Sequence, residues 1–375
     1  MRANKGLAGL IAGDTAISKV DVSTSSLWYR GYDINELCEK TSFLEVAFLL
    51  LCEKLPNLKE FQEFEAFERA HRDIPDSLYE LFKTMPSYSH PMDLLNQSVS
   101  ILGSFDEKNT LGSNSKEENL RKAMRLLAKM PTVVANSYRL SQGLTPVKPN
   151  KSLSYSENFL SMITGTETKD PLSVKTFDTS MILYAEHGYN ASTFSARVTA
   201  ATLSDLYSAV STAIGSLKGP LHGGANEQVM YMLKEIESVE RAKDYTLKKI
   251  NRKEKIMGFG HRLYRTGDSR TAVMKKLGKA LATKLNIHIW HDISDIMEAT
   301  MIEEKNIYPN LDFPAASAYY LLGIPIELYT PIFAASRITG WAAHIIEQHN
   351  DNRLIRPSCD YIGPNARTVE PISKR

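Results

Sequence analysis

Residues 178–217 read DTSMILYAEHGYNASTFSARVTAATLSDLYSAVSTAIGSL, a stretch in which apolar and small residues dominate. This composition is typical of tightly packed core helices. The pair His187-Gly188 interrupts the pattern, which predicts a break between two helices at that point. We therefore expect a buried helical centre here, with the rest of the fold packed around it.

Most of the chain on both sides of this centre also has a helical pattern. Ser42 and Glu45 form a candidate capping signature before an apolar run. Residues 17–34 mix β-forming residues with Ser, Gly and Asp, which predicts a small hairpin or an extended entry segment. Residues 104–118 and 145–157 are rich in Ser, Asn, Lys, Pro and Thr, which predicts surface loops.

The distribution of charge suggests two domains. Residues 228–305 have helical patterns with many Lys, Glu and Asp residues, whereas residues 311–346 return to apolar and small residues. This shift indicates a smaller, more exposed domain inserted between two parts of a larger helical one.

Length and charge exclude several classes of protein. At 375 residues the chain can bury a sizeable core. Its 45 Lys and Arg residues nearly balance 43 Asp and Glu residues, so no global field favours a nucleic acid or an anionic membrane. The longest strongly apolar run, 46–52, is too short to span a bilayer. The three cysteines are widely spaced and form no C-x-x-C pair, which argues against a disulfide framework or a structural zinc site. We expect a soluble, cytoplasmic protein.

Four polar clusters stand out against the helical background: EHGYNAST (186–193), GPLHGGANE (219–227), GFGHRLYRTGDSR (258–270) and YPNLDFPAAS (308–317). Each places a titratable residue beside glycine or proline. In the second cluster, His222 precedes a run with a helical pattern, where the unpaired N–H groups of a first turn disfavour an imidazolium cation. Two interpretations stay open: a neutral histidine that donates a hydrogen bond in catalysis, or a helix-start histidine with no such role.

Other kinds of site fit these clusters less well. GFGH does not continue as a dinucleotide-binding fingerprint, because Leu263 occupies the position of the third glycine and no strand precedes it. No zinc-binding spacing links His187, His222 and His261, and no G-x-S-x-G motif predicts a serine hydrolase. Acid–base chemistry on an anion remains. The arginines available to hold carboxylates or phosphates by forked hydrogen bonds are Arg265, Arg270, Arg337 and Arg356.

The four clusters, followed by SRITGWAAHIIEQHNDNRLIRPSCDYIGP (336–364), resemble the citrate synthase family in the same order. With GLAGLIAGDTAI (6–17) and WYRGYD (28–33), the resemblance covers nearly the whole chain. Within the family, YSHPMD (88–93) and LYAEHGYNASTF (183–194) are among the stretches most similar to bacterial 2-methylcitrate synthases.

The resemblance implies an all-α, citrate synthase-like fold in a homodimer. It implies a large domain at 1–223 and 328–375, and a small domain at 224–327 that closes over the active site. It also implies a reaction in which propionyl-CoA condenses with oxaloacetate and water to give 2-methylcitrate and CoA, with acetyl-CoA as the alternative substrate. No metal or organic cofactor is implied, since the CoA thioester is a substrate.

The same resemblance implies roles for individual residues. Asp312 matches the family's base, His222 the hydrogen-bond donor to the enol oxygen, and His261 the residue that protonates the oxaloacetate carbonyl. All three are present, whereas a helical scaffold that had lost catalysis would lack at least one of them. The positions that hold oxaloacetate are matched by His187, Asn190, Arg270, Arg337 and Arg356, the last reaching over from a second subunit. The basic positions that meet the CoA phosphates are matched by Arg265, Lys305 and Lys255, although Lys255 is equally well interpreted as a solvated surface charge.

Overall fold

A computed structural model describes residues 5–7, 9–109, 113–261, 263–264 and 267–375. Within them the chain forms sixteen α-helices, three short 3₁₀ helices and one small sheet, so the predicted all-α class is confirmed. None of the helices among these residues has the length and apolar character needed to cross a membrane. The helices are α1 (Ile34–Lys40), α2 (Phe43–Cys52), α3 (Leu58–Ala70), α4 (Asp76–Thr84), α5 (Pro91–Ser104), α6 (Lys116–Ser141), α7 (Tyr155–Thr164), α8 (Pro171–Tyr184), α9 (Ala191–Ala201), α10 (Leu206–Leu217), α11 (Ala225–Ile236), α12 (Val239–Asn251), α13 (Ser269–Leu285), α14 (Ile289–Lys305), α15 (Asp312–Leu321) and α16 (Tyr329–Asn350), with 3₁₀ helices η1 (Lys5–Leu7), η2 (Ile326–Leu328) and η3 (Ile372–Lys374).

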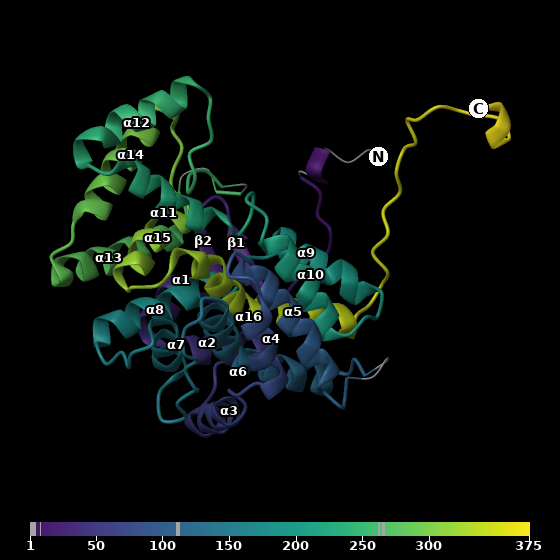
Figure 1. The fold of residues 1–375 in the computed structure, drawn as a ribbon, viewed down its shortest axis with the longest axis horizontal. Helices are drawn as coiled ribbons and strands as arrows, with labels where there is room; N and C mark the ends of the chain where they lie inside the picture. Colours follow the sequence, from purple (N-terminus) through teal and green to yellow (C-terminus); the bar gives the residue numbers. More distant parts are fainter. Residues whose placement is uncertain (1–4, 8, 110–112, 262, 265–266) are drawn as a thin grey trace.

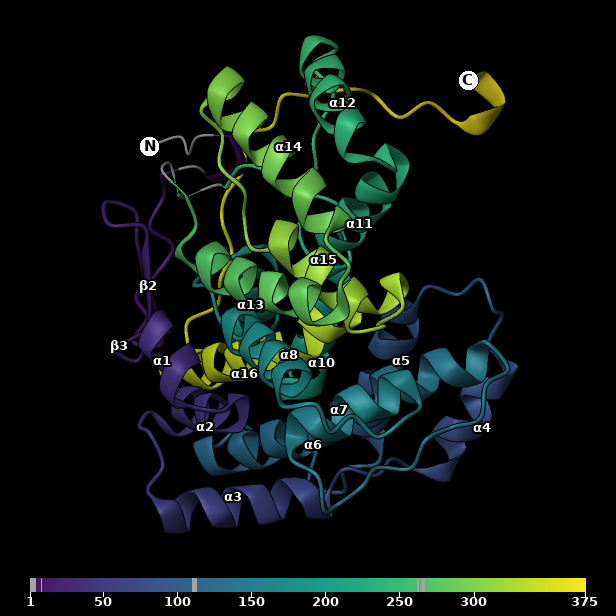
Figure 2. The ribbon, with the colours of Figure 1, turned by 90° about the vertical axis from the view of Figure 1, so that its left-hand side faces the viewer.

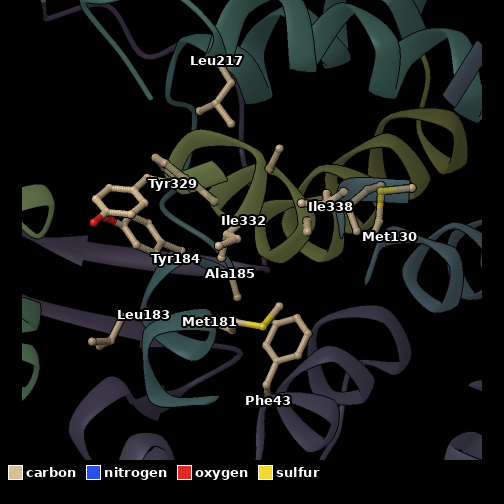
Figure 3. Close-up of a cluster of buried hydrophobic side chains, with 14 of the residues drawn as sticks. Phe43, Met130, Met181, Leu183, Tyr184, Ala185, Leu217, Tyr329, Ile332 and Ile338 are labelled. Carbon is tan, nitrogen blue, oxygen red and sulfur yellow. The ribbon is translucent and has the colours of Figure 1, made fainter. Parts of the chain in front are cut away.

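The predicted helical centre is confirmed, including its interruption, because α8 ends at Tyr184 and α9 begins at Ala191. Helix α16 runs through the middle of the helical body (Figures 1 and 2) and packs against α2, α6, α8, α9 and α10. Figure 3 shows Met181 of α8 and Phe43 of α2 near Ile332 of α16, all buried. Each such buried side chain contributes about 1.5–3 kcal/mol relative to its exposed state.

A glycine allows α16 to approach the end of α8 closely. A Cβ atom on Gly340 would lie 2.5 Å from the backbone oxygen of Ala185 and still closer to the carboxylate of Glu186. Only a residue without a side chain fits this contact, because real Cβ atoms essentially never approach other heavy atoms so closely. The end of α8, where the polar cluster 186–193 begins, is therefore fixed against the most buried helix.

The expected hairpin in residues 17–34 is present as an antiparallel sheet in the order β1-β2-β3. Tyr29 of this sheet is buried, and its hydroxyl lies 2.8 Å from the backbone oxygen of Glu186 and 3.1 Å from that of Ile182. These contacts attach the sheet to the end of α8. The strands are β1 (Ser18–Asp21), β2 (Ser26–Tyr29) and β3 (Tyr32–Asp33).

Local signals fixed several helix ends as expected. The capping box at the start of α2 is confirmed, since the Ser42 hydroxyl accepts from the Glu45 N–H and the Glu45 carboxylate accepts from the Ser42 N–H at 2.7 Å. The predicted loops 104–118 and 145–157 each end earlier than expected, because a helix begins before the last predicted loop residue. Serine caps at positions 115 and 154 begin α6 and α7 inside these ranges.

The two ends of the chain behave differently. Near the N-terminus, the backbone N–H of Ala16 donates to the Glu347 carboxylate at 2.9 Å, and the Thr15 hydroxyl donates to it at 3.3 Å. Glu347 belongs to the last turn of α16, so the beginning of the chain is attached to the last long helix. Residues 351–375 leave α16 as an exposed segment that runs away from the helical body (Figure 1).

Candidate active site

Two of the polar clusters are joined by backbone hydrogen bonds. The Gly260 N–H donates to the Tyr308 oxygen and the Asn310 N–H donates to the Gly258 oxygen, both at 2.9 Å. Gly258 has a φ of +80°, and a Cβ atom there would lie 2.7 Å from the Val229 side chain. The glycine is therefore required by both backbone conformation and space. This bridge holds the segment before His261 beside the segment before α15.

Asp312 is the first residue of α15 and is half-buried. Its backbone N–H donates to the Asn310 side-chain oxygen at 3.1 Å, and the Tyr184 hydroxyl donates to its Oδ1 at 2.9 Å. Burial raises the pKa of the Asp312 carboxyl to about 6, and the Tyr184 hydrogen bond opposes that rise. A carboxylate with a pKa near neutrality is suited to take up and release a proton.

His261 is held in one tautomer. Its Nδ1 accepts from the backbone N–H groups of Leu263 and Tyr264, both at 3.1 Å. Because a backbone N–H can only donate, Nδ1 is an acceptor and the ring hydrogen of the neutral imidazole lies on Nε2. Burial, with a smaller contribution from Arg270, lowers the pKa of His261 to about 4. His261 is thus a neutral hydrogen-bond donor at pH 7.

His222 lies in the turn before α11 and is held through one ring nitrogen. Its Nε2 lies 2.8 Å from the Ser192 hydroxyl and 3.2 Å from the Asn190 side-chain oxygen. The Trp341 indole N–H donates to the same hydroxyl at 3.1 Å. Among the described residues, none hydrogen-bonds to Nδ1 of His222, which leaves that nitrogen for a ligand.

The electrostatic state of His222 agrees with the expected neutral imidazole, but the main cause differs. Burial lowers the pKa of His222 to about 4, and the Arg337 guanidinium adds to the effect. From the sequence, the N-terminus of a helix is the expected cause of neutrality at this position. Desolvation is the larger cause in the folded protein, and it depends on packing that the local sequence does not reveal.

Arg270 is oriented by a neighbour in its own segment. Its Nε and Nη2 donate to the two oxygens of Asp268 at 2.9 and 2.6 Å, and both side chains are buried. Burial lowers the pKa of the Arg270 guanidinium, but Asp268 outweighs that effect and keeps the pKa above its ordinary value. The third nitrogen, Nη1, reaches the Leu183 backbone oxygen at 3.4 Å. The guanidinium is therefore charged and fixed.

Arg337 is a buried cation on α16 that is 1% exposed. Its Nε donates to the Tyr184 backbone oxygen at 2.6 Å, and its Cζ lies 4.8 Å from the centre of the Phe333 ring. No carboxylate among the described residues lies within ion-pair distance of it. Burial lowers the pKa of Arg337 to about 10, while the more distant Glu186 opposes the shift. A buried guanidinium without a direct acidic partner has the charge and the free donors to bind an anion.

His187 and Asn190 come from the loop between α8 and α9. The His187 ring lies 5.0 Å from that of His261, and its Nε2 lies 3.3 Å from the Tyr264 hydroxyl. Burial, followed by Arg270, lowers the pKa of His187 well below its ordinary value. Asn190 caps α9 by accepting from the Thr193 N–H at 3.1 Å, so its side chain is fixed beside His222.

One aromatic ring links the separate parts of the cluster. The Phe333 ring lies 4.2 Å from that of Tyr184 and 6.3 Å from that of His222. Tyr184 in turn hydrogen-bonds to Asp312. The Arg337 guanidinium lies over the Phe333 ring. Seven of the predicted site residues thus form one connected neighbourhood: His187, Asn190, His222, His261, Arg270, Asp312 and Arg337.

A cavity of about 420 Å³ opens beside this neighbourhood, lined among others by His261, Asp268 and Asn306. Lys305, the last residue of α14, is exposed and directly precedes Asn306. Lys255 is exposed in the turn after α12. Both lysines thus lie at the surface, and neither makes a described contact with the neighbourhood.

One predicted arginine is not part of the neighbourhood, and another cannot be placed relative to it. Arg356 lies in the exposed C-terminal segment and contacts none of the other site residues. Arg265 falls outside the described residues. Nor do the described residues contain any group of three His, Cys, Asp or Glu side chains arranged to hold a metal ion.

Sequence reasoning missed several residues that shape the site. Tyr184 and Ser192 fall within a stretch used for the family resemblance, but neither was singled out. Asp268, two residues before Arg270, was also overlooked, although an acid so close to a buried arginine is a usable local signal. No local pattern signals Phe333 or Trp341, because their roles depend on where α16 packs.

Comparisons with known proteins agree with this fold. A family model described as "Citrate synthase, C-terminal domain" matches residues 6–358. A citrate synthase of Mycolicibacterium smegmatis is 47% identical over 368 residues, covering 98% of this chain and 97% of the relative. A 2-methylcitrate synthase of Mycobacterium tuberculosis is 48% identical over 365 residues, covering 97% and 92%. A solved structure of citrate synthase from Thermoplasma acidophilum, in a ternary complex with carboxymethyl coenzyme A and oxaloacetate, matches with a TM-score of 0.93 and 31% identity, covering 99% of each chain.

The helical fold and these matches define the class of protein as an enzyme, a condensing acyltransferase. The chain belongs to the citrate synthase family. Relatives named citrate synthase and 2-methylcitrate synthase are similar to it at nearly equal identity.

Proposed function

We propose that the protein is a 2-methylcitrate synthase, which condenses propionyl-CoA with oxaloacetate and water to give 2-methylcitrate and CoA. The observation that carries the condensation chemistry is one neighbourhood in which a carboxyl with a raised pKa and two neutral imidazoles surround a buried, unpaired guanidinium. The choice of propionyl-CoA is supported by the relative named 2-methylcitrate synthase. This combination suits proton removal from a weak carbon acid next to a bound anion.

The first step removes a proton from the carbon next to the thioester carbonyl. The Asp312 carboxylate takes this proton, and the electron pair moves onto the carbonyl oxygen. The neutral His222 imidazole donates a hydrogen bond to that oxygen from Nδ1, the nitrogen without a protein partner. Stabilising the developing negative charge with a preoriented neutral donor lowers the barrier without requiring a prior proton loss.

The second step forms the carbon–carbon bond. The enol carbon attacks the keto carbon of oxaloacetate, and the oxygen of that carbonyl takes the proton from Nε2 of His261. The tautomer supports this role, because the backbone donors of Leu263 and Tyr264 occupy Nδ1 and keep the hydrogen on Nε2. Water then attacks the thioester carbonyl carbon and the carbon–sulfur bond breaks. One proton of the water restores His261, and the CoA thiolate leaves with the proton that Asp312 took, which releases 2-methylcitrate and the CoA thiol.

Oxaloacetate is a dianion, and the site offers fixed cations for it. Arg270 and Arg337 hold its carboxylates by forked hydrogen bonds, with His187 and Asn190 beside them. Arg356 of a second subunit completes the set in a homodimer, which is consistent with its place in an exposed segment away from its own site. Calorimetric titration of wild type with oxaloacetate alone tests this binding mode, and an absence of heat at saturating concentration contradicts it.

The CoA thioester binds on the cavity side of His261. Arg265, Lys305 and Lys255 meet its phosphates, and residues 224–327 act as a small domain that closes on the large domain of 1–223 and 328–375. The small domain closes after oxaloacetate binds, because the dianion must first occupy the arginine cluster before closure is favoured. Closure then keeps water away from the enol intermediate. Small-angle scattering with and without oxaloacetate tests this order, since an unchanged radius of gyration contradicts it.

The second candidate function is a citrate synthase that uses acetyl-CoA, or an enzyme that uses both thioesters. This candidate is considered because a relative named citrate synthase and one named 2-methylcitrate synthase are identical to the chain to nearly the same extent. One methylene is worth about 1–3 kcal/mol in an apolar pocket, so a few side chains decide the preference. The test is thiol release with propionyl-CoA and acetyl-CoA side by side, with the products identified by mass. A higher kcat/KM for acetyl-CoA contradicts the 2-methylcitrate synthase assignment.

The proposed reaction needs no metal and no organic cofactor, because each proton transfer has a protein donor or acceptor. Turnover measured after prolonged dialysis against a chelator is expected to equal that of the untreated enzyme. Loss of activity that returns with a divalent cation would contradict this part of the proposal. We further propose that the enzyme acts in the cytoplasm, which fractionation of cells that express the full chain tests.

A further inference from the structure

We infer that Tyr184 is a positioning residue for the base: its hydroxyl donates to Oδ1 of Asp312, fixes the carboxylate, and leaves Oδ2 free to take the substrate proton. This inference rests on the proposed function, in which Asp312 is the base. The observation behind it is the 2.9 Å hydrogen bond between two residues that are 128 positions apart in the chain.

The Tyr184 side chain is held too firmly to be an incidental neighbour. Tyr184 is 1% exposed and is the last residue of α8. Its backbone oxygen accepts from Arg337 at 2.6 Å, and its ring packs on Phe333 at 4.2 Å. A phenol fixed at both its backbone and its ring presents its hydroxyl in one place.

The direction of the hydrogen bond is defined by chemistry. Burial, with the negative charge of Asp312 as the next cause, raises the pKa of Tyr184 well above its ordinary value. The phenol therefore keeps its proton at all working pH values and can only donate to a carboxylate. Donation favours the charged form of Asp312 over the protonated form, which opposes the effect of burial.

Other charged and titratable groups also face Asp312, from two further elements and from its own helix. Asp268 and Arg270 act from the start of α13, Arg337 from α16, and Tyr319 from its own helix α15. Among the described side chains, only Tyr184 hydrogen-bonds to the carboxylate. Removing its hydroxyl therefore changes one contact with the base and leaves the surrounding charges in place.

The deciding experiment compares the pH dependence of kcat for wild type and Tyr184→Phe with saturating oxaloacetate and acyl-CoA. Loss of a hydrogen bond to a charged group raises the pKa of the carboxyl by about 1–2 units, so the acid limb moves to higher pH by that amount. At pH 7 the variant is expected to turn over roughly two to ten times more slowly, and to recover at higher pH. The dissociation constant of oxaloacetate should stay unchanged.

The matched control is Tyr319→Phe. Tyr319 is also a fully buried tyrosine, and it donates to the Ser180 hydroxyl at 3.0 Å instead of to Asp312. Its removal should leave the acid limb where it is in wild type. Replacing Tyr184 by a difluorotyrosine, a more acidic and stronger donor, should shift the limb in the opposite direction from phenylalanine. A merely structural role of Tyr184 would not produce shifts of opposite sign.

The outcomes separate this inference from the proposed function. If wild type releases no thiol from either acyl-CoA, the proposed function fails. If wild type is active and the limb is unchanged in folded Tyr184→Phe, the inference fails. If circular dichroism shows that Tyr184→Phe does not fold, the difluorotyrosine enzyme decides, because an unchanged limb there overturns the inference as well.

Discussion

Glu186 and His344 are both fully buried and are joined by a 2.9 Å contact between Oε1 and Nε2. The same carboxylate accepts from the Ser18 hydroxyl at 2.8 Å and from the Gly188 N–H. It therefore connects α16, the N-terminal sheet and the loop that carries His187. Burial raises the pKa of Glu186, but His344 and Arg337 outweigh burial and hold the pKa below its ordinary value.

Glu186→Gln is expected to lower the free energy of unfolding by about 1.5–3 kcal/mol at pH 7, because it removes a buried, charged acceptor of hydrogen bonds. Since the folded pKa lies below 4.5, the contribution of Glu186 is present above pH 4.5 and is lost as the pH falls through the folded pKa. Urea unfolding of wild type and variant between pH 4 and pH 8 measures the difference.

The control for Glu186 is Glu36→Gln, which removes an exposed pair with Lys40 at 2.7 Å. An exposed pair at this helical spacing contributes little to stability, because solvent screens the two charges. If both variants lose the same small free energy of unfolding, the connecting role given to Glu186 is wrong.

Asp312→Asn is expected to reduce kcat by roughly 10²–10⁴, the usual effect of a positioned acid–base group, while oxaloacetate binding persists. Steady-state kinetics with calorimetric titration of oxaloacetate measures both quantities. Near-normal turnover in a preparation whose sequence is verified by mass would remove Asp312 from the role of base.

The same substitution should stabilise the fold at neutral pH. The folded pKa of about 6 lies above the ordinary value of 3.8, so the native state binds this proton more tightly than the unfolded state. Wild-type stability attributable to Asp312 is therefore lost as the pH rises from 3.8 to 6, by up to about 3 kcal/mol. Urea unfolding should show Asp312→Asn to be more stable at pH 7, with the gain absent below pH 3.8. A variant less stable than wild type at pH 7 would show that the buried Asp312 carboxylate does not destabilise the folded protein.

Gly258→Ala is expected to destabilise the fold more than Gly323→Ala. Both glycines have positive φ, +80° and +74°, so both substitutions carry a backbone cost of about 1–2 kcal/mol. Only at Gly258 would the new Cβ atom meet neighbours, at 2.7 Å from Val229 and 2.9 Å from Phe313, whereas Gly323 has nothing within 4 Å. Overpacking adds about 1–3 kcal/mol. Equal midpoints of urea unfolding for the two variants would show that the bridge before His261 tolerates a side chain.

The sharing of sites between subunits is tested by mixing two inactive variants. Arg356→Ala leaves one oxaloacetate carboxylate without its partner, and losing one member of such a pair costs about 2–5 kcal/mol. If Arg356 acts across the interface, a mixed dimer with Asp312→Asn contains one site with both defects and one with neither. Activity is expected to return toward half of wild type per mixed dimer. Verified mixed dimers that stay as inactive as both parents would place Arg356 in its own subunit's site or outside any site.

Much of the fold could be predicted from the sequence because the relevant signals are local. The serine cap at Ser42, the hairpin in 17–34 and the break at His187-Gly188 each depend on neighbouring residues, and the structure contains all three. Serine caps inside the two predicted loops are local signals too, and there the cap prevails over the polar composition and begins a helix.

The contacts that determine the state of the site residues could not be predicted in the same way. Tyr184 meets Asp312 across 128 positions, and Ser192 meets Trp341 across 149. These contacts depend on the packing of α8 and α9 against α15 and α16. The neutral state of His222 was predicted from a helix start, but burial by the same packing is its main cause.

The attachment of Ala16 to Glu347 has a consequence for how the chain is made. The two residues are 331 positions apart, so the N-terminal segment leaves the ribosome long before its partner exists. The Tyr29 hydroxyl likewise cannot donate to the Glu186 backbone oxygen until the end of α8 has been synthesised. Contacts this distant in sequence are slow to form, and a nascent chain that lacks α16 exposes the apolar faces that this helix covers. Translation that stalls before residue 329 therefore yields a product without its central helix, which quality-control proteases and chaperones would meet as an unfolded protein.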